Sequence, residues 1–166
     1  MSNFKIRYAN KDDNHQIFLL IKQLGEFEKI ADEYVVTEEV LYDSLFVKNK
    51  AEVLIGEIDG VPIGYVLFFS NFPTSYGKAG LYIEDIFVMP EYRGRGYGKQ
   101  IFKYIANIAV NRNCAKMEWI CLNWNESAKK FYESLGAEKK EDWVVYSLME
   151  DGMKKIAQSS EDKNQQ

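Results

Sequence analysis

The sequence predicts an α+β fold in which helices flank a mixed, mostly antiparallel central sheet. Apolar residues at strand-like and helix-like spacings alternate along the chain in the order β-α-α-β-β-β-α-β-α-β. The dipeptide Asp59-Gly60 joins two of the strand-like runs, and such a two-residue loop is typical of an antiparallel hairpin. This hairpin excludes a purely parallel, doubly wound sheet, so a layered α+β arrangement fits better.

The size and composition of the chain predict one domain. It has 166 residues, of which 46% are hydrophobic and 14% aromatic, so it can bury a sizeable core. The apolar periodicity is lost from Glu150 onward, and the chain ends in the polar run SSEDKNQQ. We therefore expect a single domain over residues 1–150 and a frayed tail over residues 151–166.

The N-terminal region predicts a strand followed by a helix. Residues 4–9 alternate apolar and polar side chains, as a half-buried strand does. Asp12 or Asp13 can cap the helix that follows. Its buried face consists of Ile17, Leu20, Ile21 and Leu24.

This helix runs into an acidic patch formed by Glu26, Glu28, Asp32 and Glu33. Acidic side chains are mostly solvated, so the patch can be an exposed helix end and loop. The alternative is that it forms a wall of a cation site. Thr37 then begins a second helix, which we expect to end near Phe46 or Val47.

The rest of the chain predicts five strands and two helices. Residues 52–58 and 61–69 form the Asp59-Gly60 hairpin, and Pro90 ends the strand after it. Gly136 is suited to the position just after a helix. The elements after the hairpin are a strand over 81–88, a helix from Gly98 to about 111–113, a strand over 117–122, a helix over 125–135 and a strand over 144–149.

Charge and special residues exclude several classes of protein. The net charge of -4 and the pI of about 5.2 argue against nonspecific nucleic-acid binding. Cys114 and Cys121 match no zinc pattern, so we expect reduced core thiols and no metal. The single histidine, His15, makes a histidine-based triad improbable and is expected on the surface. No apolar run reaches the ~18 residues of a membrane span, and no signal-peptide core is seen, so we expect a cytoplasmic protein.

One glycine loop lies between the strand over 81–88 and the next helix. Gly94, Gly96 and Gly98 alternate there with Arg93 and Arg95 among them. Glycine lets backbone N–H groups close on an anion, and a helix N-terminus favours negative charge, so the loop suits a phosphate chain. The patterns GxxxxGK[ST] and GxGxxG are both absent, and a lone glycine loop is as often a structural turn.

The wider context of this loop resembles a known family. The spacing Arg93-x-x-Gly96-x-Gly98 after a strand resembles the acyl-CoA pyrophosphate loop of the GNAT acetyltransferase superfamily. IRYANKDD resembles that family's first strand and helix, and WNESAKKFYESLGA resembles its C-terminal motif. The runs LIKQLGEFE, LYIEDIFVMPEYRGRGYG and WNESAKKFY are similar to the diamine, or spermidine/spermine, N-acetyltransferase branch. The resemblance covers about residues 3–149.

The resemblance implies acetyl-CoA as co-substrate, no metal, and frequently a homodimer. Acetyl transfer to an amine requires that CoA be held, the thioester polarised, the amine neutralised and the leaving thiolate protonated. By resemblance Glu84 is the base, acting through water, and Tyr132 is the acid. The residues expected to bind CoA are Ile86, Phe87, Val88, Arg93, Gly94, Arg95, Gly96, Tyr97, Gly98, Lys99 and Asn125.

The two adjacent acids in the strand also attract attention on physical grounds. An acid that interrupts a buried apolar strand is costly unless it has a task or a partner. In a regular strand Glu84 and Asp85 should point to opposite faces, whereas a bulge could re-aim Asp85 toward a substrate.

The acceptor implied by the branch is a small polyamine or diamine. The residues expected to bind it are Phe27, Glu28, Glu84, Asp85, Glu141 and Trp143. A lysine-like, thialysine-type amino acid or another small amine is the close alternative. A noncatalytic acyl-CoA-binding module is the alternative from a different class.

Overall fold

The computed structural model describes residues 3–159, and these residues divide into two compact units between Leu122 and Asn123. We call residues 3–122 the first unit and residues 123–159 the second unit. A single domain over residues 1–150 with a separate tail over 151–166 stays a prediction. Residues 160–166 of that tail lie outside the described residues.

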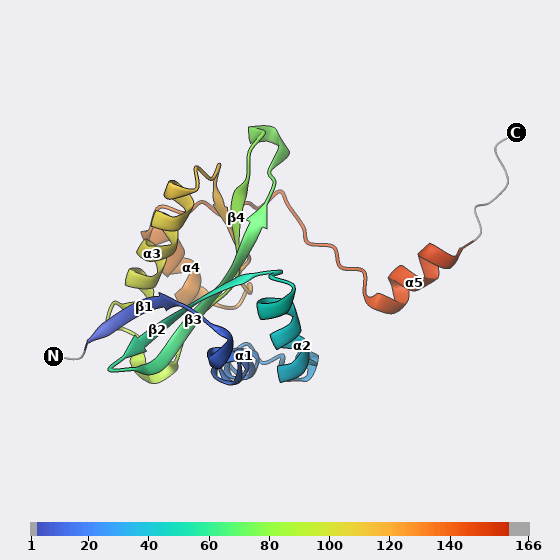
Figure 1. Ribbon diagram of the computed structural model, residues 1–166. Helices are drawn as coiled ribbons and strands as arrows, with labels where there is room; N and C mark the ends of the chain where they lie inside the picture. The colour runs from blue at the N-terminus through green and yellow to red at the C-terminus, as the bar shows by residue number, and fades with distance from the viewer. Residues whose placement is uncertain (1–2, 160–166) are drawn as a thin grey trace, which may run out of the picture. The chain divides into compact units, whose positions relative to one another are not determined.

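The first unit is built on a five-stranded sheet in the order β1-β2-β3-β4-β5 (Figure 1). Neighbouring strands are antiparallel except β4 and β5, which are parallel. This confirms the mixed, mostly antiparallel sheet. The strands are β1 (Phe4–Tyr8), β2 (Glu52–Ile58), β3 (Val61–Asn71), β4 (Gly80–Val88) and β5 (Met117–Glu118).

The hairpin between β2 and β3 turns at Asp59 and Gly60, as predicted. Their φ angles are 50° and 82°. Positive φ at both central residues is the requirement of the turn that matches strand twist, and Asp-Gly meets it. The turn sets the pairing of Ile58 with Val61 next to it, and the register shifts by one residue further along, between Gly56 and Glu57.

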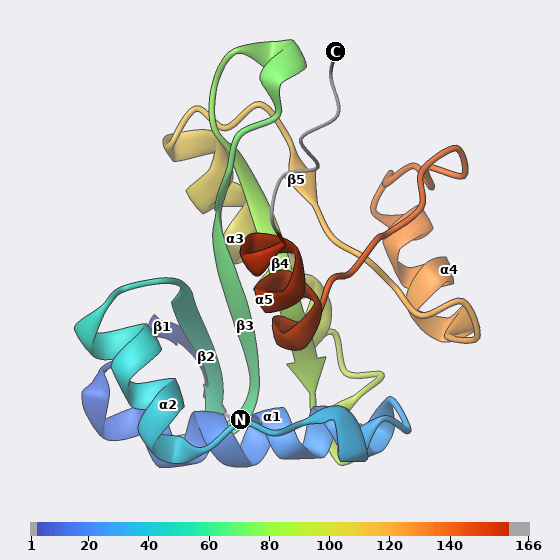
Figure 2. The ribbon, with the colours of Figure 1, turned by 90° about the vertical axis from the view of Figure 1, so that its right-hand side faces the viewer.

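Helices cover both faces of the sheet. Helix α1 (Asn14–Phe27) and helix α2 (Glu38–Tyr42), which continues as a π-helical segment (Asp43–Val47), lie on one side. Helix α3 (Tyr97–Asn111) lies on the other (Figures 1 and 2). The core under α1 and α2 consists of Ile17, Leu20, Ile21, Leu24, Leu41, Leu45, Val53, Ile55, Tyr65 and Phe87. Under α3 the helix buries Ile101, Phe102, Ile105 and Ala109.

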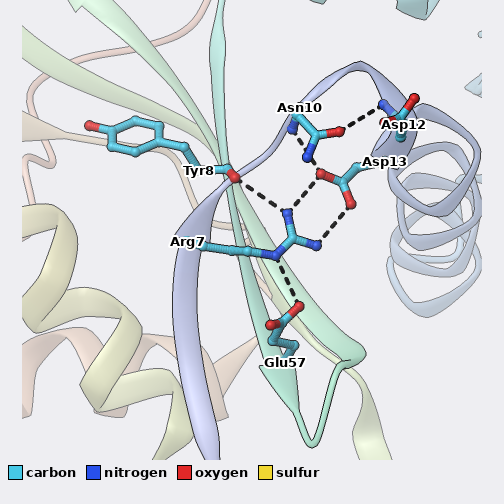
Figure 3. Close-up of polar contacts among 6 residues, drawn as sticks. All are labelled: Arg7, Tyr8, Asn10, Asp12, Asp13 and Glu57. Carbon is cyan, nitrogen blue, oxygen red and sulfur yellow. Dashed lines mark hydrogen bonds and ion pairs between the residues drawn. The ribbon is translucent and has the colours of Figure 1, made fainter.

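The start of α1 differs from the sequence prediction. Neither Asp12 nor Asp13 caps α1 through its side chain. Instead Asn10 caps the short 3-10 turn that precedes it, accepting from the Asp12 N–H at 2.9 Å (Figure 3). Asp13 completes this capping box, and its carboxylate also binds the Arg7 guanidinium at 2.8 and 2.9 Å. The ion pair with Arg7, on the neighbouring strand, is what the local pattern could not reveal.

The second unit contains α4 (Glu126–Ser134) and α5 (Glu150–Gln158). As predicted, Asn125 begins α4, with its Oδ1 accepting from the Ala128 N–H at 3.1 Å, and Gly136 follows with a φ of 89°. Helix α5 contradicts the expected loss of periodicity after Glu150. The expected strand over 144–149 is also wrong in the described residues, because the segment has no ladder partner and Tyr146 is 91% exposed.

The structure also tests the predictions for the last strand of the sheet, the cysteines and the histidine. The strand expected over 117–122 spans only Met117–Glu118, where it pairs with β4. Cys114 and Cys121 form no disulfide among the described residues, and both are half-buried rather than fully enclosed. His15 is exposed, as expected, and contacts Glu38. No helix of the described chain is long and apolar enough to cross a membrane.

Candidate functional site

Strand β4 carries a bulge at its pair of acids. Phe68 of β3 pairs with Ile83 and the preceding Leu67 pairs with Asp85, so Glu84 is the extra residue. A bulge changes the direction of the side chains beside it, so Glu84 and Asp85 need not point to opposite faces as they would in a regular strand. Glu84 is exposed, whereas Asp85 is turned toward the buried ring of Tyr65.

Asp85 is held by a phenol from the neighbouring strand. The Tyr65 side chain is fully buried, and its hydroxyl donates to Asp85 Oδ2 at 2.9 Å. Burial raises the pKa of Asp85 to about 6, the hydrogen bond from Tyr65 opposes this rise, and the carboxylates of Glu84 and Glu28 add to it. Asp85 is therefore an acid whose charge changes close to neutral pH.

Glu28 forms a second pair of the same kind at the end of α1. The Tyr34 hydroxyl donates to Glu28 Oε2 at 3.2 Å. Burial raises the pKa of Glu28, and this hydrogen bond opposes the rise. Burial and the carboxylates of Glu28 and Asp85 raise the pKa of Tyr34, which keeps the phenol protonated as a donor.

Glu28, Glu84 and Asp85 together form what we call the carboxylate cluster. Their charges influence one another and the two phenols, so they lie in one electrostatic neighbourhood. Among residues 3–159, none of the three forms an ion pair with a lysine or arginine. Negative charge without an internal counter-ion favours a cationic ligand.

An arginine lies where α1 and β4 end. The Arg93 guanidinium carbon is 4.1 Å from the centre of the Phe27 ring and 5.4 Å from that of Phe87. Its Nε donates to the Val88 carbonyl at 2.7 Å. Arg93 is the first residue of the predicted phosphate loop. Its side chain packs on Phe27, the aromatic residue next to Glu28.

The glycine loop has the backbone that an anion site requires. Gly94 and Gly96 have φ angles of 75° and 82°, and Gly96 begins α3 without a side-chain cap. A Cβ atom would meet nothing within 4 Å at either position, so backbone conformation rather than space demands glycine there. The first N–H groups of α3 have no partner within the helix and are available to a phosphate, so the loop fits the pyrophosphate of CoA.

The loop's other predicted residues lie as follows. Arg95 packs its guanidinium carbon 5.9 Å from the Tyr92 ring, and Tyr97 stacks on Phe4 with ring centres 4.6 Å apart. Gly98 lies in the first turn of α3 and is half-buried, and Lys99 lies there and is exposed. Lys99 therefore projects a charge near the helix N-terminus, where phosphate is favoured.

Beside this loop, the far edge of β4 has no strand paired to it among residues 3–159. Strand β5 pairs with β4 only at Leu81 and Tyr82. Beyond them, Ile86, Phe87 and Val88 pair with β3 on one edge but have no strand on the other among the described residues. Backbone groups at such an edge can bond a ligand that carries amides, as pantetheine does.

The remaining predicted residues belong to the second unit. Tyr132 lies in α4 beside Phe131, with ring centres 5.6 Å apart, and is half-buried. Glu141 is exposed and pairs with Lys139 at 3.0 Å, which lowers the pKa of the Glu141 carboxyl. Trp143 is 80% exposed. Asn125 is used as the cap of α4.

Sequence reasoning missed Tyr34 and Tyr65. Tyr65 lies within an apolar strand and reads as core, although a buried tyrosine usually needs a partner for its hydroxyl. That need was the available signal, but the partner depends on strand register. The residues next to Tyr34 in the sequence give no sign of its role. Its position depends on a tertiary contact, since its ring packs over Gly25 of the preceding helix, where an added Cβ would come within 2.8 Å of the ring.

Comparison with known families gives a match over most of the chain. Residues 15–137 match the acetyltransferase (GNAT) family. The chain is 33% identical to a mouse thialysine N-epsilon-acetyltransferase, with 95% of this chain and 99% of the relative covered. It is 41% identical to an Arabidopsis thaliana L-ornithine N5-acetyltransferase, with 92% and 87% covered. A human spermidine/spermine N(1)-acetyltransferase-like protein is 29% identical, with 88% of this chain and 22% of that protein covered.

A solved structure confirms the fold. An integron cassette protein from the mobile metagenome of V. cholerae superposes with a TM-score of 0.78 at 25% sequence identity. The alignment covers 94% of this chain and 98% of that protein. The mixed sheet with helices on both faces is therefore an arrangement that known proteins share.

Proposed function

Because the chain belongs to the acetyltransferase (GNAT) family and is an acyl-CoA-dependent N-acetyltransferase, we propose that it acetylates a primary amine of a small polyamine or diamine. The observation that carries this proposal is the carboxylate cluster at the bulge of β4. Its three acids have no internal cation among the described residues, so a ligand with several ammonium groups would supply the missing charge.

We propose that CoA is held by the glycine loop and the far edge of β4. The backbone N–H groups from Gly94 to Lys99 would bind the pyrophosphate, with Arg93 and Arg95 adding charge. Ile86, Phe87 and Val88 would bind pantetheine, and a backbone N–H there would stabilise the oxyanion. Asn125 would contact CoA from the start of α4. Bound there, acetyl-CoA supplies the thioester that the amine attacks.

Glu84 is the proposed base. An alkyl ammonium has a pKa near ~10.4, so it must lose a proton before its nitrogen can attack a carbonyl carbon. Glu84 is exposed at the bulge, where a water can pass that proton to its carboxylate. As the carbon–sulfur bond breaks, Tyr132 gives its phenolic proton to the thiolate. Once the carbon–nitrogen bond has formed, the attacking nitrogen loses its second proton, which restores the Tyr132 phenol. Of the two protons that leave the ammonium group, one therefore reaches solvent through Glu84 and the other replaces the proton given to sulfur.

Asp85 and Glu28 are the proposed sites for the second ammonium group of the acceptor, with Phe27 as an aromatic neighbour. Glu141 and Trp143 complete the set of proposed acceptor residues from the second unit. A carboxylate that accepts one hydrogen bond from a neutral phenol keeps its negative charge for a cation.

A lysine-like amino acid is the second candidate acceptor. The mouse and Arabidopsis relatives bear the names of thialysine and ornithine acetyltransferases, and both of these amino acids carry an amine on a flexible chain. The noncatalytic module is set aside, because the chain belongs to a family of enzymes.

A thiol-release assay over a panel of amines tests the acceptor. The panel pairs spermidine, spermine and short diamines with monoamines of equal chain length, and adds ornithine, lysine and thialysine. We expect kcat/KM for the diamines to exceed that for matched monoamines by at least about tenfold, since one ion pair in the site is worth roughly 1.4 kcal/mol or more. Equal rates for monoamines would contradict a role for the carboxylate cluster, and preference for amino acids would select the second candidate.

We also propose a cytoplasmic homodimer. Cys114 and Cys121 form no disulfide among the described residues, which fits a reducing compartment. Residues 143–149 expose several large apolar side chains, including Val144 and Val145 at 72% each, and these suit a subunit interface. Light scattering after size exclusion measures the mass, and a monomer at micromolar concentration would contradict the dimer.

A further inference from the structure

Two phenol–carboxylate pairs stand side by side in the carboxylate cluster. Tyr65 of β3 donates to Asp85 of β4 at 2.9 Å, and Tyr34 donates to Glu28 at the end of α1 at 3.2 Å. The pairs come from separate segments of the chain. Each pair consists of a neutral phenol donor and an acid, so neither phenol neutralises the charge of the carboxylate that it binds.

The Tyr65 hydroxyl is not required by packing. The ring lies in an apolar core beside Ile55 and Phe87, and its whole side chain is inaccessible to solvent. Phenylalanine would fill the same space without placing a polar atom there. A buried hydroxyl costs free energy unless it is hydrogen-bonded, and here its partner is the Asp85 carboxylate.

Tyr34 is also held in place by the fold. Its ring packs against Gly25, the residue three positions before Glu28, and a Cβ there would come within 2.8 Å of the ring. Glycine within a helix is unfavourable, so this small residue has a packing reason. The space it leaves lets the phenol reach Glu28.

Each pair leaves one carboxylate oxygen for a ligand. Tyr65 bonds Oδ2 of Asp85 and Tyr34 bonds Oε2 of Glu28. Within the described residues, Oδ1 of Asp85 and Oε1 of Glu28 receive no hydrogen bond from the protein. We infer that Tyr65 and Tyr34 are positioning residues of the acceptor site, which orient these two carboxylates so that their second oxygens bind the ammonium groups of the amine.

This inference rests on the proposed function and has a consequence for pH dependence. The groups that face Asp85 are Tyr65 from β3, Glu84 from β4 and Glu28 from α1, with Tyr34 bonded to Glu28. Of these, the Tyr65 hydroxyl is the one that favours the ionised form of Asp85. Its removal raises the pKa of Asp85, so the carboxylate would become protonated, and lose its attraction for an ammonium group, at a higher pH.

The test is the pH profile of kcat/KM for the amine in Tyr65→Phe. We expect its acidic limb to move upward by about one pH unit, because a hydrogen bond to a charged group is worth roughly that much, with KM for acetyl-CoA unchanged. Tyr42→Phe, on α2 and outside the site, is the matched control and should keep the wild-type profile. An unmoved limb in Tyr65→Phe overturns the inference.

A double-mutant cycle with Asp85→Asn separates positioning from packing. If Tyr65 acts through Asp85, Tyr65→Phe should change amine KM no further once residue 85 is asparagine. Equal effects in both backgrounds would overturn the inference. If Tyr65→Phe does not fold, Tyr34→Phe with Glu28→Gln repeats the cycle at the second pair, and Gly25→Ala, which displaces the Tyr34 ring, should raise amine KM as Tyr34→Phe does.

Failure of the proposed function is recognised separately. Wild-type enzyme that acetylates no amine in the panel would refute the proposed acceptor. In that event the carbon-13 NMR titration of the Asp85 carboxyl, in wild type and Tyr65→Phe, still tests the pairing, since the pKa of Asp85 should rise in the variant. An unchanged pKa there overturns the inference.

Discussion

The sheet of the first unit carries two groups of carboxylates, and their partners differ in kind. Beside β1, Arg7 binds Asp13 through two nitrogen atoms and Glu57 through a third, at 2.8 to 3.0 Å (Figure 3). At the bulge of β4, Asp85 accepts a hydrogen bond from the Tyr65 hydroxyl, and Glu28 accepts one from the Tyr34 hydroxyl. Neither acid forms an ion pair among the described residues.

The pKa values move in opposite directions at the two places. Arg7 holds the pKa of Asp13 below its usual range, mainly through their hydrogen bonds. Burial raises that of Asp85 to about 6. Asp13 and Glu57 share an arginine within the fold, whereas the acids of the carboxylate cluster form no ion pair with lysine or arginine among residues 3–159. Counting acids in the sequence cannot separate these two uses.

The largest expected effect comes from Tyr132→Phe, which asks whether the carboxylate cluster suffices for turnover. Without a proton donor for the thiolate, we expect kcat to fall by about 10³-fold, the usual scale for general acid catalysis. CoA affinity, measured by calorimetry, should be nearly unchanged because only one hydroxyl is lost. A kcat equal to that of wild type would refute the acid role.

Glu84→Gln should reduce kcat by about 10²-fold near neutral pH. The loss should shrink as the pH approaches the amine's own pKa near ~10, where the acceptor is already neutral. Glu91→Gln, at an exposed acid of the short turn Pro90–Tyr92, is the matched control. A deficit that stays constant across the pH range would argue against Glu84 as the base.

Asp85→Asn should weaken amine binding yet stabilise the protein. We expect KM for the amine to rise about tenfold through the loss of one charged contact. Because the folded pKa of Asp85, about 6, exceeds its ordinary value of 3.8, ionisation opposes folding. The free energy of unfolding should therefore increase by up to about 3 kcal/mol above pH 6.

This gain has a defined pH window. Protonation of Asp85 stabilises the wild type as pH falls through about 6. The difference between Asp85→Asn and wild type should therefore decline below that pH and level off near the ordinary pKa of 3.8. Urea unfolding at several pH values measures it, and a gain independent of pH would show that burial of charge is not its cause.

Arg7→Met should have the smallest and purely structural effect. We expect the free energy of unfolding to fall by about 2 kcal/mol, since three charge-assisted hydrogen bonds are lost on a partly solvated side chain. Stability from Asp13 is present above its ordinary pKa of 3.8 and is lost as pH falls through its lower folded value, so this acid sensitivity should vanish in the variant. Any large change in amine KM would break the contrast between the two groups.

Much of the fold could be predicted where the information is local. Asp59-Gly60 gave the hairpin because both residues tolerate positive φ. Gly96 and the apolar face of α3 predicted where the loop ends and the helix begins. Asn125 and Gly136 predicted the two ends of α4. Local periodicity failed at residues 144–149, because an apolar run becomes a strand only when another strand supplies its hydrogen bonds.

By itself, the sequence determined the glycine loop, the helix that follows it and the presence of Glu84 and Asp85 in one strand. Each of these depends on backbone preferences within a few residues. Tertiary structure alone decided that Glu84 is the bulged residue, that Tyr65 meets Asp85 across 20 positions of sequence, and that Arg93 stacks on Phe27. Such contacts depend on strand register and on how a helix end packs against the sheet. Strand pairing brings together residues that are far apart in the sequence, and neither residue's local sequence indicates its partner.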